Sequence, residues 1–181
     1  MLDVRRLLSL IIYLRSLARE MKSFLKYWLP LLVWLCVIFL GSTNLMSAEH
    51  TSRFIVPFLL WLKPGMSPKT IWIILIVTRK CAHVCEYAIL ALLLWRALRS
   101  GPTLRMSTPI LFGAVLLACA VFAASDEFHQ SFIKSRTPSV RDVVLDVAGA
   151  LLGLLIGTSF AARHAKQTPT TNESQFVDAR L

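Results

Sequence analysis

Four long apolar segments constrain the fold of this chain more than any other feature of its sequence. The approximate bounds of these segments are residues 27–45, 71–98, 108–124 and 140–162. A helix needs about 20 mostly apolar residues to cross the hydrocarbon core of a bilayer. Hydrophobic residues form 56% of the chain, above the roughly 45–50% of soluble domains, and the excess lies in these segments. The sequence therefore predicts an all-α, polytopic membrane protein with a four-transmembrane-helix bundle.

The segment before the first span, residues 1–26, mixes Leu and Ile with basic side chains at a helical period. The basic residues are Arg5, Arg6, Arg15, Arg19, Lys22 and Lys26. This pattern is typical of an amphipathic helix on an anionic membrane surface. In a second interpretation Met21 is the true start and residues 1–20 are dispensable. The membrane domain is expected over residues 27–163, and the polar segment 164–181 is expected to be a disordered tail.

The net charge of +10 would suggest nucleic acid as the partner of a soluble protein. In a membrane protein, anionic lipid head groups are the more natural partner, and no nucleic-acid motif is present. Lys and Arg are more frequent in the N-terminal segment, the turn at 96–105 and the C-terminal tail than in the other loops. The positive-inside rule therefore predicts that both termini are cytoplasmic and that the polar motifs lie toward the outer side.

A polar stripe occupies the first half of the second span. Its members are Arg79, Lys80, His83, Glu86 and Tyr87. At 100° per residue they fall within about 120° of one another, so one face of this helix is polar and the rest is apolar. Ionisable groups at membrane depth are costly and by default indicate a functional site.

A second polar group surrounds the connection between the third and fourth spans. Its members are Asp126, Glu127, His129 and Gln130 on the third span, Arg136 in the loop, and Asp142 and Asp146 on the fourth span. The two aspartates of the fourth span share a face, within about 80°, with Gly149, Gly153 and Gly157. Small residues at this spacing let a neighbouring helix approach closely. The carboxylates are therefore expected on the packed face, in a polar cleft shared with the stripe of the second span.

Two kinds of chemistry fit these residues. Arg79, Lys80 and Arg136 could clamp a phosphate, which Arg binds bidentately. Asp126 or Glu127 with His129 could then act as acid and base, and these three are the catalytic candidates. The simpler alternative is that the cations neutralise the carboxylates and tie the helices together. The spacings match no standard zinc pattern, so metal binding stays open and no cofactor is evident.

At these residues the sequence resembles the VanZ-like family of bacterial membrane proteins. The matching motifs are Arg79-Lys80-x-x-His83-x-x-Glu86-Tyr87, Asp126-Glu127-x-His129-Gln130-x-Phe132, and Arg136-x-x-Ser139-x-x-Asp142-Val143-x-x-Asp146-x-x-Gly149-x-x-x-Gly153. The chain departs from the family pattern in two places. Lys134-Ser135 replaces a frequent Pro-Gly pair, and Asp146 replaces a frequent Asn. The resemblance implies a bacterial plasma (inner) membrane protein of the cell envelope, in a family linked to resistance to the glycopeptide teicoplanin.

Three functions remain open at the level of sequence. The leading hypothesis is an outward-facing polar cleft that binds or modifies an envelope lipid or its phosphate head group, with membrane lipids or a lipid-linked envelope precursor as partner. The second is a non-catalytic binding or accessory protein of the envelope. The third is a small proton-coupled transporter, because intramembrane acids and histidines can relay protons. Whether the protein is an enzyme stays open.

Overall fold

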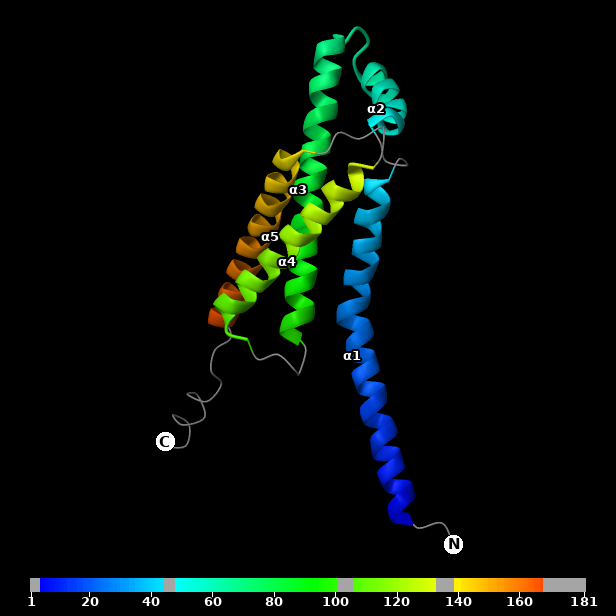
Figure 1. The fold of residues 1–181 in the computed structure, drawn as a ribbon, viewed down its shortest axis with the longest axis vertical. Coiled ribbons are helices and arrows are strands. Elements are labelled where there is room, and N and C mark those ends of the chain that lie inside the picture. The colour runs from blue at the N-terminus through cyan, green and yellow to red at the C-terminus, as the bar shows by residue number, and fades with distance from the viewer. Residues whose placement is uncertain (1–3, 44–47, 101–105, 133–138, 168–181) are drawn as a thin grey trace, which may run out of the picture.

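The computed structural model describes residues 4–43, 48–100, 106–132 and 139–167. This part of the chain forms helices α1 (Val4–Ser42), α2 (Ala48–Leu62), α3 (Pro68–Ser100), α4 (Thr108–Gln130) and α5 (Val140–Gln167) and contains no strand (Figure 1). Four segments are long and apolar enough to cross a membrane, namely Leu8–Ser42, Pro68–Ser100, Thr108–Gln130 and Val140–Phe160. The prediction of an all-α protein with four apolar spans is therefore confirmed.

All four spanning helices are longer than the apolar segments from which they were predicted, and α1 and α4 extend the furthest. α1 runs without a break through residues 26 and 27, because no Gly or Pro occurs between Val4 and Leu29 to end it. Its 39 residues rise about 58 Å, well beyond the roughly 30 Å hydrocarbon core of a bilayer. α4 continues to Gln130 and so carries the polar residues after 124 on the helix itself. Residues 168–181 of the predicted tail lie outside the described residues.

α3 is the central helix and contacts each of the other four described helices. Its buried residues include Tyr87, Leu90, Ala91, Leu94 and Ala97, which form much of the core. Because these residues recur every three to four positions, they line one face of the helix and hold the bundle around it.

α5 makes the most extensive packing with α3, and glycines allow the close approach. A Cβ atom at Gly149 would lie 2.5 Å from the carbonyl oxygen of Val84, and one at Gly153 would lie 2.5 Å from that of Ala88. At Gly157 a Cβ would instead meet the end of the Leu92 side chain. The first two glycines therefore place the backbones of α3 and α5 in direct contact.

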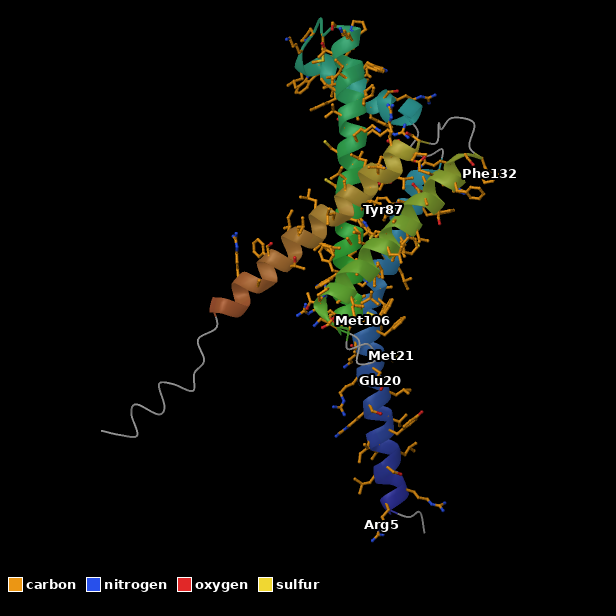
Figure 2. The ribbon with its side chains drawn as sticks, turned by 60° about the vertical axis from the view of Figure 1, so that its left-hand side comes forward. Arg5, Glu20, Met21, Tyr87, Met106 and Phe132 are labelled. Carbon is orange, nitrogen blue, oxygen red and sulfur yellow. The ribbon has the colours of Figure 1, made fainter. Side chains whose placement is uncertain are left out.

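The ends of three helices gather at one level of the bundle. The C-terminal ends of α1 and α4 and the N-terminal end of α5 lie beside the middle of α3, while α2 packs against the earlier turns of α3 beyond them (Figure 1). The N-terminal end of α1 and the C-terminal end of α5 point toward the opposite end of the bundle (Figure 1). Figure 2 shows Tyr87 inside the bundle at this level and Phe132 at the far end of α4 from Met106.

Candidate functional site

A cavity of about 320 Å³ lies where α1, α2, α3 and α4 meet. Its polar lining residues are Ser42 of α1, Thr78, Arg79, His83 and Glu86 of α3, and Asp126 and Gln130 of α4. Apolar side chains, among them Ile38 and Ile55, complete the wall. The volume is at the lower end of the range of about 300–1,000 Å³ that is usual for small-molecule sites.

Some residues of the polar stripe of α3 line the cavity, and the others contact neighbouring helices. Arg79, His83 and Glu86 line the cavity. Tyr87 is 1% exposed and lies in the core. Lys80 is half exposed and forms an ion pair with Asp142 of α5. Because the stripe covers about a third of the helix surface, its two edges meet different neighbours.

His83 connects the cavity to α5. Its Nδ1 lies 3.1 Å from Oδ1 of Asp146, whose side chain is fully buried. A carboxylate on one ring nitrogen fixes the orientation of the imidazole and the role of the other nitrogen. His83 therefore lines the cavity as an imidazole oriented by Asp146, and its second nitrogen, Nε2, has no hydrogen-bond partner among the described residues.

The two aspartates of α5 both serve partners on α3. Asp142 pairs with Lys80, and Asp146 pairs with His83. Neither of the two aspartates lines the cavity. These contacts support the simpler interpretation for this pair, namely that their charges tie α5 to α3.

At the end of α4, Asp126 and Gln130 lie one turn apart and both face the cavity. The amide Nε2 of Gln130 donates a hydrogen bond of 2.8 Å to Oδ2 of Asp126. This bond assigns the Gln130 amide, because its nitrogen must face the carboxylate. The carbonyl oxygen Oε1 of Gln130 is therefore the group that remains for other partners.

The other two acid–base candidates lie away from the cavity. Glu127 turns toward α5, where its Oε2 accepts a hydrogen bond of 2.7 Å from the backbone N–H of Ser139. Ser139 directly precedes α5, so the carboxylate sits at a helix N-terminus, where a negative charge is stabilising. The ring of His129 lies against Phe39 of α1, with 5.1 Å between the ring centroids. Among the three candidates, only Asp126 borders the cavity.

Several buried oxygen atoms of the described residues have no hydrogen-bond partner. They are Ser42 Oγ, Tyr87 Oη, Glu127 Oε1, Gln130 Oε1 and Asp146 Oδ2. Ser42 and Gln130 belong to the cavity wall and are only 3% and 1% exposed. Buried polar atoms are almost always hydrogen-bonded, so this wall is chemically suited to receive a polar ligand.

The predicted loop residue Arg136 lies outside the described residues, as do Lys134 and Ser135. Within the described ranges, no group of three or more His, Cys, Asp or Glu side chains is arranged to hold a metal ion.

Sequence reasoning missed the contribution of α1 and α2 to the cavity. Ser42, Ile38 and Ile55 carry no periodic or charge signal that would mark them. It also missed Trp34 of α1, whose indole Nε1 donates a hydrogen bond of 3.0 Å to the backbone carbonyl of Glu86. A tryptophan in the middle of a span, away from the interfaces that it usually occupies, was the one available hint.

Comparison with known proteins gives one match. The family model described as VanZ/LLP1 matches residues 27–161. The matched segment includes every residue that lines the cavity and both aspartates of α5. No curated protein and no solved structure matches the chain.

Proposed function

Because the chain belongs to the VanZ/LLP1 family, we propose that this multi-pass protein resides in the bacterial plasma membrane and that its cavity binds the phosphate-bearing head group of an envelope lipid. The observation that carries the proposal is the convergence of α1, α2, α3 and α4 on one cavity in which Arg79 and other polar side chains share the wall with apolar ones. Both termini are cytoplasmic in this proposal, which puts the cavity toward the outer leaflet.

Arg79 is the phosphate-binding residue of the proposed site. Its side chain is half buried in the cavity wall, and no carboxylate of the described residues forms an ion pair with it. Lys80, by contrast, is already paired with Asp142. A guanidinium that has no carboxylate partner among the described residues offers two parallel N–H donors to phosphate oxygens.

The size of the cavity supports a head group as the ligand. A volume of about 320 Å³ holds a small polar group but not the acyl chains of a lipid. The outward surfaces of the spans expose large apolar side chains, such as Ile76, Val77 and Phe39. Acyl chains of a bound lipid would therefore remain in the bilayer while the head group enters the protein.

The test is recovery of bound lipid from protein purified in nanodiscs, measured by native mass spectrometry. The wild-type protein should retain phospholipid, and Arg79→Gln should retain about tenfold less, as expected for loss of one charge-assisted contact. Arg96→Gln is the matched control, because Arg96 lies near the other end of α3 against the Tyr27 ring. Equal retention by both variants would contradict the proposal.

A second candidate is acid–base chemistry on the bound head group, favoured by the His83–Asp146 pair. In this hydrolysis a water forms a bond to the head-group phosphorus and gives its proton to Nε2 of His83, while Asp146 holds Nδ1; the P–O bond to the leaving alcohol breaks, and that alcohol takes the proton back from His83. Incubation with phospholipid vesicles, followed by assay for released phosphate or released head group, tests this candidate. Loss of this activity in His83→Gln, with lipid still retained, would establish acid–base chemistry at the site. Absence of any release by the wild-type protein would contradict it.

An envelope role also connects the protein to the family association with teicoplanin. Deleting the gene and restoring it with wild-type or Arg79→Gln protein tests this connection. If head-group binding matters for the envelope, only the wild-type gene should restore teicoplanin susceptibility to its original value.

A further inference from the structure

One part of the cavity wall presents hydrogen-bond acceptors to whatever it binds. Gln130 is 1% exposed; its Nε2 donates to Asp126, and its Oε1 has no hydrogen-bond partner among the described residues. The carboxylate of Asp126 lies one turn away on α4, and Glu86 adds a second carboxylate from α3. An acceptor that is buried without a donor costs free energy. This wall therefore suits a ligand that brings N–H or O–H donors, and the two carboxylates favour a positive charge.

The acceptors and Arg79 occupy different depths of the cavity. On α3, Glu86 follows Arg79 by seven residues, which corresponds to about 10 Å along the helix. α4 runs antiparallel to α3, so Asp126 lies one turn farther into the bundle than Gln130 (Figure 1). Arg79 is on the side of the cavity toward α2, where Ile55 and Leu75 also line it. In the proposed topology the α2 end of the cavity faces the outer leaflet, so a ligand entering from there would meet Arg79 first and the carboxylates of Asp126 and Glu86 deeper in the bundle.

Resting on the head-group binding proposed above, we propose that the head group carries a primary ammonium group in addition to its phosphate. The ammonium lies between Gln130 Oε1 and Asp126, near Glu86, and the phosphate lies at Arg79. This order fits an aminophospholipid, in which the ammonium is the terminal group and enters first. A primary ammonium supplies three N–H donors and one positive charge, so it satisfies both the amide oxygen and the carboxylates.

Two related head groups meet only half of these requirements. A trimethylammonium group carries the charge but has no N–H donor for Gln130 Oε1. A glycerol head group has O–H donors but brings no positive charge to the two carboxylates. Binding from a defined mixture of lipids with these three head groups therefore separates the two contributions.

The experiment reconstitutes the full chain in nanodiscs with equal amounts of phosphatidylethanolamine, phosphatidylcholine and phosphatidylglycerol, and measures the retained lipids by native mass spectrometry. Phosphatidylethanolamine should be enriched about tenfold over each of the others, as expected for one hydrogen bond to a charged group. Asp126→Asn and Gln130→Leu should each reduce this enrichment severalfold. Glu127→Gln is the control that should keep it, because Glu127 faces α5 instead of the cavity.

The outcomes separate this inference from the function on which it rests. Retained lipid without preference for phosphatidylethanolamine would overturn the ammonium site and leave phosphate binding standing. Retention of no lipid by the wild-type protein would overturn both. A preference that survives both Asp126→Asn and Gln130→Leu would also refute the assignment, and the wild-type preference is informative even where a variant does not fold.

Discussion

Asp146 of α5 is fully buried, and its Oδ1 lies 3.1 Å from Nδ1 of His83 on α3. The two residues belong to helices whose backbones touch at Gly149 and Gly153. His83 also forms part of the cavity wall. The most closely packed helix pair of the bundle is thus linked directly to the candidate site. A change in the packing of α5 against α3 should therefore shift the position of His83 in the cavity wall.

The first prediction concerns the strength of this pair. Asp146→Ala and His83→Ala should each destabilise the protein, and a double-mutant cycle should give a coupling free energy of about 1–2 kcal/mol. This exceeds the roughly 0.6 kcal/mol average for hydrogen bonds between membrane helices, because Asp146 has no alternative exposure to water. The measurement is reversible unfolding in mixed micelles with increasing SDS. Additive effects of the two substitutions would show that the pair contributes nothing as a unit.

The second prediction concerns the glycines of α5. Gly149→Ala and Gly153→Ala should each lower the free energy of unfolding by about 1–3 kcal/mol, because the new Cβ would press on the backbone of α3. Gly157→Ala should cost much less, since the atom in its way is the end of the flexible Leu92 side chain. The same SDS titration measures all three.

Gly113→Ala is the matched control for the glycine series. Gly113 is inside α4, and nothing lies within 4 Å of a Cβ built there. Its replacement should leave stability unchanged or raise it, because Ala has the higher helix propensity. A loss in Gly113→Ala as large as that in Gly149→Ala would mean that contact with α3 is not the cause.

The fold could be predicted from sequence because its main determinant is local. Each span is a run of apolar residues long enough to cross a bilayer, and such runs need no knowledge of their neighbours. The first and last residues of the helices were less well determined by the sequence. The polar residues 125–130 are unfavourable in lipid but do not break a helix, so α4 extends past the predicted limit of 124. Lys26 similarly marks a change in polarity within α1, not the end of a helix.

The site could be predicted only in part. Helical periodicity tells on which face of its own helix a residue lies, but it does not tell which other helix packs against that face. Asp126 and Gln130 are four positions apart and share the cavity, whereas Glu127 is rotated by 100° and reaches Ser139 at the start of α5. His129 meets Phe39 of α1, a contact between residues that are far apart in sequence. Such pairings depend on how the helices are arranged, and no spacing within one helix reveals them.

The third prediction follows from the contact between Glu127 and Ser139. Glu127→Leu should increase amide hydrogen exchange in residues 139–143, because the first turn of α5 loses the carboxylate that accepts the Ser139 N–H. Glu127→Gln keeps an acceptor oxygen and should show a much smaller increase. Exchange measured by mass spectrometry compares the two variants. Equal protection in Glu127→Leu and wild type would show that the contact does not stabilise the start of α5.

The fourth prediction concerns the N-terminal part of α1. The described side chains before Tyr27 are exposed or half-exposed, and Figure 2 shows those around Arg5 projecting from α1 with no other helix beside them. The core contacts of α1 begin at Tyr27 and Trp28. Removing residues 1–20, so that Met21 starts the chain, should therefore change the free energy of unfolding by less than about 0.5 kcal/mol. A truncated protein that is inserted but clearly less stable would show that this segment contributes to the bundle.

The fifth prediction concerns membrane topology, which depends on whether α2 crosses the membrane. Its 15 residues rise about 22 Å, which is short of the roughly 30 Å hydrocarbon core, so α2 should not cross the membrane. With four crossings both termini should lie on the same side, and the basic residues near the start of α1 and the end of α3 predict that this side is the cytoplasm. Green fluorescent protein fused to either terminus should therefore fluoresce, and alkaline phosphatase inserted between Lys63 and Ser67 should be active. If α2 crossed, the termini would lie on opposite sides and one terminal fusion would be dark.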